Sequence, residues 1–188
     1  MNESVSTPVL PETFLGGSAP HLLSFELRGI PFPTFPNLVL SFTQIRHLYL
    51  EDIPHSGYIS PEIMANCLGA LPNLTILSIG FQSPLSRPVG MTPPPLTRAV
   101  FPALTEPFFC GVSEYFEDFV ARIEGSRLYF FSITFFMDLI FDIPRLRNFI
   151  NRTPAERVAQ VSMEFTSQGI KIICGNRLRL AIKCERLD

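Results

Sequence analysis

Apolar and polar residues alternate along this chain in a six-residue phrase that returns at regular intervals. Apolar side chains stand at its first, fourth and sixth places. Clear copies begin at Leu22 (LLSFEL), Ile45 (IRHLYL) and Leu74 (LTILSI), and weaker copies at Leu104 (LTEPFF), Leu128 (LYFFSI) and Val158 (VAQVSM). Successive copies start 23, 29, 30, 24 and 30 residues apart. Such alternation predicts a short strand with one buried face, repeated about six times.

Helical patterns lie between the predicted strands. Residues 60–71 start with Ser60, a suitable N-cap, and Pro61, which suits a first turn. Residues 113–123 start with Ser113 as the expected cap, and residues 144–151 form a shorter candidate. The first helix carries an apolar stripe of Ile63, Met64, Cys67, Leu68 and Leu71; the second is expected to bury Tyr115 or Phe116 with Phe119, Val120 and Ile123. The helix dipole accounts for Glu114, Glu117 and Asp118.

A strand, a turn and a helix repeated at this period predict an α/β fold, a leucine-rich-repeat-like solenoid arc. Its parallel sheet has about six short strands, with irregular helices and loops on the convex side. We expect an N-terminal arm over residues 1–18, the repeat domain over 19–168 with a proline-rich loop at 83–95, and a C-terminal β-hairpin cap over 169–188. Gly175-Asn176 supplies the hairpin turn. Pro107 is expected to break or bulge the fourth strand.

Composition narrows the class of protein. The 188 residues suit one domain, 46% are hydrophobic and 17% charged, and mean hydropathy is +0.25 with a net charge of -2. These values exclude a disordered chain and do not favour nucleic-acid binding. The most apolar run, residues 128–141, contains Asp138 and is too short to span a bilayer. With no leader sequence, we expect an intracellular protein, cytoplasmic or nuclear and not secreted, without a membrane partner.

Motifs for catalysis or cofactor binding are missing from the sequence. The four cysteines, at 67, 110, 174 and 184, are too widely spaced for a disulfide scaffold or a CxxC site. The three histidines match no metal-ligand spacing, and His55-Ser56 is best explained by a turn around Gly57. No phosphate-binding glycine motif and no GxSxG sequence occur. We therefore expect no enzyme, cofactor or metal.

The remaining candidate is the strand face opposite the buried phrase positions. If the phrase residues point inward, the alternate positions line a concave surface that mixes aromatic and charged groups. Such mixtures are enriched where proteins bind one another. The candidate partner-binding residues are Glu26, Arg28, His47, Tyr49, Glu51, Glu106, Phe108 and Phe130.

Several longer phrases resemble one protein family. They include LPETFLGGSAPHLLSFELRGIPFP, LEDIPHSGYISPEIMANCLGALPNLTILSIGFQSP, PPPLTRAVFPALTE, GVSEYFEDFVARI and ITFFMDLIFDIPRLRNFINRT. Together, over about residues 9–170, they resemble the leucine-rich-repeat portion of the F-box-like proteins of mushroom-forming (basidiomycete) fungi. The resemblance implies a non-enzymatic, substrate-recognising protein-protein interaction module of an SCF-type ubiquitin ligase, in which an F-box docks a Skp-type adaptor.

The resemblance has one departure. No F-box precedes Leu10, so adaptor binding is carried over to no residue and depends on an F-box upstream. The alternatives are a truncated or decayed family copy without an active partner and, at a few per cent, an unrecognised enzyme.

Overall fold

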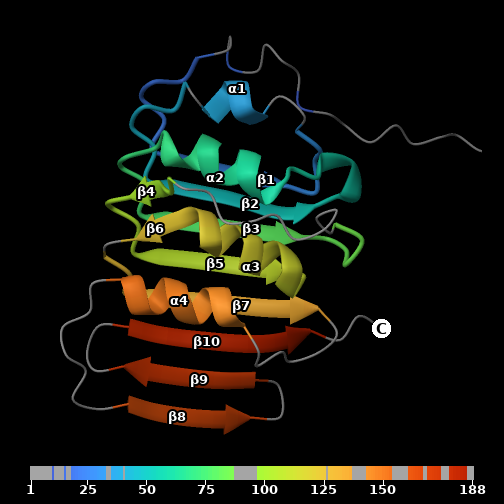
Figure 1. Ribbon diagram of the computed structural model, residues 1–188. Helices are drawn as coiled ribbons and strands as arrows, with labels where there is room; N and C mark the ends of the chain where they lie inside the picture. The colour runs from blue at the N-terminus through green and yellow to red at the C-terminus, as the bar shows by residue number, and fades with distance from the viewer. Residues whose placement is uncertain are drawn as a thin grey trace, which may run out of the picture.

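One eight-stranded sheet organises the molecule in the computed structural model (Figure 1). The structure describes residues 10, 15, 18–32, 35–39, 41–86, 97–125, 127–136, 143–153, 161–166, 169–174 and 178–185. The strands of this sheet are β1 (Ser24–Arg28), β2 (His47–Ile53), β3 (Ile76–Phe81), β5 (Glu106–Gly111), β7 (Phe130–Phe136), β8 (Val161–Thr166), β9 (Gly169–Cys174) and β10 (Leu178–Glu185). They are ordered β1-β2-β3-β5-β7-β10-β9-β8.

The first five predicted strands are confirmed. β1, β2, β3, β5 and β7 each fall within or just after a copy of the phrase, and neighbours pair in parallel. The fourth and sixth phrase residues are buried in all five copies. The fold is thus mixed α/β, with a parallel sheet built in chain order from one recurring pattern.

The C-terminal order differs from the prediction. β9 and β10 pair as the expected antiparallel hairpin, and its predicted turn at Gly175-Asn176 lies outside the described residues. β10 also pairs in parallel with β7, and β8 pairs antiparallel with β9. The hairpin therefore lies between the fifth and sixth phrases and does not cap the sixth. All three strands are rich in apolar residues with one or more polar residues between them, so the local pattern does not decide which one reaches β7.

The helices are α1 (Phe35–Val39), α2 (Pro61–Gly69), α3 (Ser113–Arg122) and α4 (Pro144–Arg152). Ser60 caps α2 as predicted, because its hydroxyl accepts a hydrogen bond from the Ile63 amide at 3.3 Å. The predicted cap of α3 is wrong: Ser113 is the first helical residue, and its hydroxyl donates to Glu114 instead. Ile63 also departs from the predicted stripe, being 47% exposed.

Three short elements were not predicted. They are α1 and a parallel pair of strands, β4 (Ala99–Phe101) and β6 (Ile123–Gly125). The turn expected around Gly57 is the 3₁₀ helix η2 (His55–Gly57). Of the proline-rich loop, only residues 83–86 are described, and most of the N-terminal arm lies outside the described residues.

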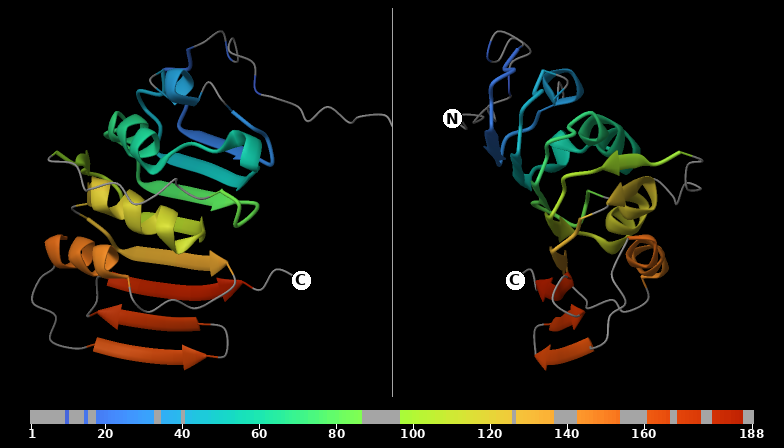
Figure 2. Two further views of the ribbon diagram at one scale, coloured as in Figure 1. Left: turned by 45° about the vertical axis from the view of Figure 1, so that its right-hand side comes forward. Right: turned by 90° about the vertical axis from the view of Figure 1, so that its left-hand side faces the viewer.

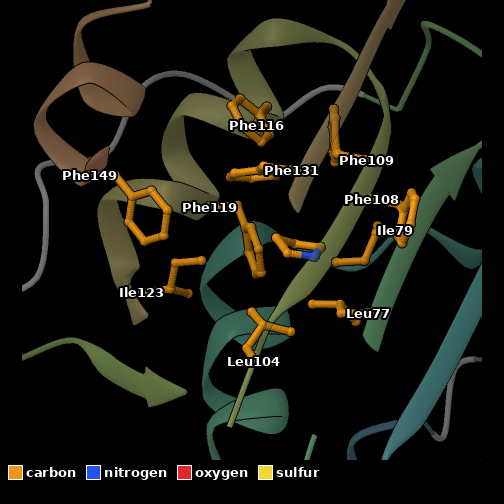
Figure 3. Close-up of a pocket in the computed structure, with 11 residues that line it drawn as sticks. Leu77, Ile79, Leu104, Phe108, Phe109, Phe116, Phe119, Ile123, Phe131 and Phe149 are labelled. Atoms are coloured by element: carbon orange, nitrogen blue, oxygen red, sulfur yellow. The ribbon is translucent and has the colours of Figure 1, made fainter. Parts of the chain in front are cut away.

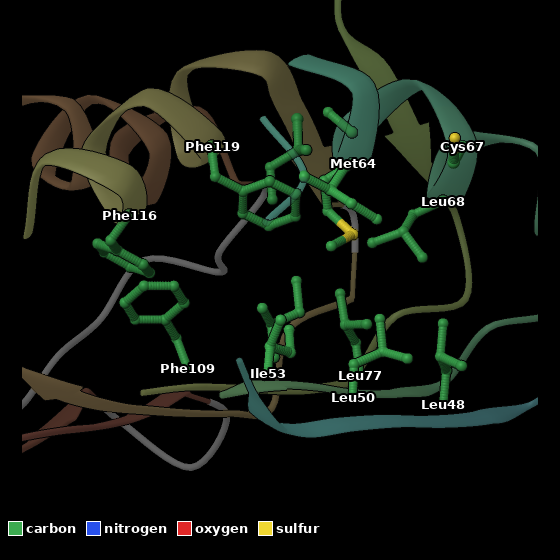
Figure 4. Close-up of a cluster of buried hydrophobic side chains, with 14 of the residues drawn as sticks. Leu48, Leu50, Ile53, Met64, Cys67, Leu68, Leu77, Phe109, Phe116 and Phe119 are labelled. Atoms are coloured by element: carbon green, nitrogen blue, oxygen red, sulfur yellow. The ribbon is translucent and has the colours of Figure 1, made fainter. Parts of the chain in front are cut away.

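The core lies between the sheet and its helices (Figure 4). Leu48, Leu50 and Leu77 rise from the strands toward Met64 and Leu68 of α2, and all five are buried. Both Tyr115 and Phe116 of α3 are fully buried, and Phe119 and Val120 are buried as predicted; Ile123 is also buried, but α3 ends at Arg122 and Ile123 begins β6. Burial of these side chains is the main force that holds the helices on one face of the sheet.

A recurring hydrogen-bond pattern aligns the strand starts. The carbonyl of Arg46 accepts from the amides of Thr75 and Ile76, and the carbonyl of Thr75 accepts from Thr105 and Glu106. The threonine hydroxyls add bonds to the same carbonyls, Thr75 to Arg46 at 2.9 Å and Thr105 to Thr75 at 3.1 Å. Each strand is thereby tied to its neighbour before regular pairing begins, which sets its register.

Pro107 does not break its strand, so that prediction is wrong. β5 pairs with β3 from Glu106 through Cys110, including Leu77 with Pro107. The Glu106 amide donates toward β3, so alternation turns the Pro107 nitrogen toward β7, where pairing starts only at Phe108. A proline near a strand start therefore costs little. The register shift lies in β2 instead, between Leu50 and Ile53, where Asp52 has a φ of 52°.

Buried charges join α3 to α4. The carboxylate of Glu117 accepts from the amides of Arg145 at 2.8 Å and Leu146 at 2.9 Å, which are unpaired donors in the first turn of α4. Asp118 pairs with Arg122 at 3.3 Å and Arg145 at 2.9 Å. The dipole of their own helix does not explain these two residues, because their side chains are buried and bond to α4.

Removal of the Glu117 carboxylate should loosen α4. We expect Glu117→Ala to lower the free energy of unfolding by about 2 kcal/mol, because two buried amides lose their acceptor. Glu117→Gln keeps one carbonyl oxygen and should lose about half as much. Urea unfolding followed by circular dichroism measures both variants, and equal losses would contradict the capping role.

Two neighbouring tyrosines differ in how their hydroxyls are satisfied. The Tyr115 hydroxyl donates to the Ile59 carbonyl at 3.0 Å, whereas the buried Tyr58 hydroxyl has no hydrogen-bond partner among the described residues. Burial, and secondarily the charge of Asp118, raises the pKa of Tyr58 to about 12. The pKa of Tyr115 is also raised by burial, then by Tyr58 and Asp118.

The two tyrosine-to-phenylalanine variants should therefore act in opposite directions. We expect Tyr58→Phe to stabilise by about 1 kcal/mol, since it removes an unsatisfied hydroxyl, and Tyr115→Phe to destabilise by a similar amount. Because its pKa is raised, Tyr58 makes the fold more stable below pH 10 than at higher pH, and the difference develops as pH rises toward 12. Thermal melts of each variant at pH 7 and pH 11 test this, and loss of stability in Tyr58→Phe at pH 7 would contradict it.

Candidate functional site

One face of the sheet is left without a helix among the described residues. The right-hand view of Figure 2 shows the helices on one side of the strands. On the other side lie the alternate residues of β1, β2, β3, β5 and β7, and we call this set the open face. Its members are Ser24, Glu26, Arg28, His47, Tyr49, Glu51, Ile76, Ser78, Gly80, Glu106, Phe108, Cys110, Phe130, Ser132 and Thr134. All except the buried Gly80 are exposed or half-buried.

The strand alternation predicted from the sequence is therefore correct. The eight candidate residues all lie on the open face, but the structure divides them into groups. Charged side chains gather on β1 and β2, and an aromatic pair lies on β5 and β7. His47 and Glu106 lie apart from both groups, each beside Ile76 in the register.

Phe108 and Phe130 form the aromatic pair. Their ring centroids are 5.6 Å apart and their planes are tilted by 54°. Phe108 pairs with Ser132 in the register, so Phe130, which lies two residues before Ser132 on β7, is its diagonal neighbour. Diagonal contact across adjacent strands is within reach of aromatic side chains. The pair is half-buried, so it presents apolar surface on a face that no described element covers.

Tyr49 lies on the same cross-strand row as the pair. The register runs from Glu26 through Tyr49 and Ser78 to Phe108. Ser78, a small residue, lies between Tyr49 and Phe108 in this row, so no large side chain connects the two rings. The face therefore offers separate aromatic positions.

A charged cluster occupies the β1–β2 end of the open face. Arg28 donates to Glu51, lies 3.8 Å from a carboxylate oxygen of Glu26, and reaches Asp52 at 3.4 Å. Ser78 donates to the other oxygen of Glu51 at 3.4 Å. One guanidinium is thus shared by three carboxylates. Because Arg28, Glu26 and Asp52 are largely exposed, the ion pairs of Arg28 with Glu26 and Asp52 contribute little to stability.

Asp52 is the member that the sequence analysis missed. Simple alternation places it on the helix side of β2, next to Glu51. The register shift after Leu50 and the left-handed backbone at Asp52 bring its carboxylate to Arg28 instead. Asp is among the residues that tolerate this conformation, which is the one local signal for the bulge.

A small cavity lies on the opposite side of the sheet (Figure 3). Its volume is about 10 Å³, and its lining is apolar, with Leu77, Leu104 and Phe119 among its walls. It is about as large as one water molecule and lacks the polar partners that a water needs. This cavity is therefore a packing defect with no room for a substrate.

Possible metal ligands, thiols and membrane-spanning helices are the other candidate features of the described part of the chain. No cluster there of three or more His, Cys, Asp or Glu could hold a metal ion. Cys67 is a buried thiol, and burial raises its pKa. No described helix has the length and apolar character needed to cross a membrane.

Comparison with protein families, with curated proteins and with solved structures found no match for this chain. Function is therefore inferred from the geometry of the open face.

β5 and β7 each carry two consecutive phenylalanines that lie on opposite faces of the sheet, so truncating each of them tests which face is buried. We expect Phe109→Ala and Phe131→Ala, which empty buried positions, to destabilise by about 3–5 kcal/mol. Phe108→Ala and Phe130→Ala, which truncate open-face side chains, should each cost about 1 kcal/mol. Urea midpoints of the four variants give the comparison. Similar losses for Phe108→Ala and Phe109→Ala, or for Phe130→Ala and Phe131→Ala, would contradict the register described above.

Proposed function

We propose that this chain is a non-enzymatic protein-binding module that uses the open face to hold a partner protein. The observation that carries the proposal is the half-exposed aromatic pair, Phe108 and Phe130, on the same sheet face as the Arg28 charge cluster, a face that no described helix covers. Aromatic anchors with charged groups around them are the usual composition of protein-binding surfaces.

The fold we propose for this module is a leucine-rich-repeat-like solenoid. Three observations support it: five parallel strands follow one another in chain order, helices lie on one side only among the described residues, and the hydrogen bonds at the strand starts repeat. In such a fold each repeat contacts mainly its neighbours, which leaves a long row of strand residues for a partner.

The family resemblance suggests a role for such a surface. In F-box-like proteins the repeat portion would select the substrate of an SCF-type ubiquitin ligase. We propose the same kind of role for the open face here, by binding alone. Apolar anchoring would come from Tyr49, Phe108 and Phe130, and charge complementarity from the β1–β2 end.

Peptide selection provides the test. A random-peptide display library would be panned against the full chain, and selected peptides would be synthesised for affinity measurements. We expect the triple variant Tyr49→Ala, Phe108→Ala, Phe130→Ala to weaken their binding at least tenfold, because the anchors are removed.

A matched control removes apolar side chains elsewhere. Ile63, Leu85 and Val100 are 47%, 70% and 55% exposed and lie outside the open face. The corresponding triple-alanine variant should bind the selected peptides with unchanged affinity. If the control variant loses binding and the open-face variant keeps it, the proposed surface is wrong.

A further inference from the structure

The open face has a charge imbalance that specifies its partner more closely. Resting on the function proposed above, we infer that the open face takes a basic-and-apolar segment of a partner protein. A lysine or arginine of that segment lies against Glu26 and Glu51, and an apolar side chain packs against Phe108 and Phe130.

The β1–β5 part of the open face carries an excess of negative charge. Four carboxylates lie on or at the edge of the β1–β5 part of this face, those of Glu26, Glu51, Asp52 and Glu106, against the single guanidinium of Arg28. This part alone is more negative than the whole chain, whose net charge is -2. A cationic partner would therefore be attracted to this face rather than to the molecule in general.

Arg28 cannot neutralise all three carboxylates that it contacts. It contacts Glu26, Glu51 and Asp52 at once, so two negative charges remain. The Glu51 side chain is only 29% exposed, whereas those of Glu26 and Asp52 are 61% and 54% exposed. A cation placed beside Glu51 would be partly shielded from water, where an ion pair is stronger than at an open surface.

The distance between the charged cluster and the aromatic pair sets the length of the partner segment. Tyr49, Ser78 and Phe108 share one row, and Glu51 lies two residues beyond Tyr49. With about 4.8 Å per strand and about 3.3 Å per residue, the Cα atoms of Glu51 and Phe108 are roughly 12 Å apart. A partner segment spans that distance with about four extended residues or about eight helical ones.

The experiment reads the sequences of peptides selected on the full chain. We expect enrichment of lysine or arginine together with leucine, phenylalanine or another large apolar residue, at one of the two spacings. The affinity of a synthesised peptide should fall at least fivefold in the double variant Glu26→Gln, Glu51→Gln. It should also fall as sodium chloride is raised from about 50 mM to about 500 mM, because salt screens exposed charges.

The control keeps the number of removed charges the same. Glu62 of α2 and Glu124 of β6 are exposed and lie outside the open face. The double variant Glu62→Gln, Glu124→Gln should bind the same peptide with the same affinity as the unmodified chain. Circular dichroism melts of both double variants show whether each is folded, and the single variant Glu26→Gln replaces the pair if Glu51→Gln unfolds the protein.

The outcomes separate this inference from the proposed function. Peptides without enriched basic residues that still need Phe108 and Phe130 would overturn the inference and leave the binding face standing. An unchanged affinity in the folded open-face carboxylate variant would overturn it as well. Peptides that bind equally well to the Tyr49, Phe108, Phe130 triple-alanine variant would overturn both.

Discussion

The parallel register of the strands is the constraint on which the other features depend. Shared carbonyls at Arg46, Thr75 and Thr105 hold the starts of neighbouring strands together. A slip of one residue would move each buried leucine or phenylalanine to the open face and each charged residue into the core. The register therefore fixes the core and the candidate surface in one step, because they are opposite sides of the same strands.

Burial on the helix side gives the open face its rigidity. Phe109 and Phe131 are packed in the core, and each lies next in sequence to a member of the aromatic pair. The backbone that carries Phe108 and Phe130 is thus held from behind by buried neighbours. A surface whose anchors are already positioned loses less conformational entropy on binding. Polar bonds add local order, with Ser78 and Arg28 orienting Glu51.

The helix side is held by a different balance of forces. Apolar packing fixes α2, α3 and α4 on the sheet, and α4 is in addition joined to α3 through Glu117 and Asp118. Buried carboxylates are tolerable there because backbone amides and two arginines satisfy them. The buried charges therefore act within the fold, whereas the carboxylates of Glu26, Glu51 and Asp52 lie at the surface of the open face.

The sequence alone determined the five parallel strands, the helices α2, α3 and α4, and which strand residues face outward, because period-two and period-3.6 patterns record burial locally. It could not determine the place of β10 beside β7, since no local pattern in β8, β9 or β10 marks the strand that pairs with β7 and only long-range pairing separates them. The three-residue strands β4 and β6 are too short to show a period. Contacts of Asp52 with Arg28 and of Glu117 with α4 join residues 24 to 29 positions apart, so only the tertiary structure decided them.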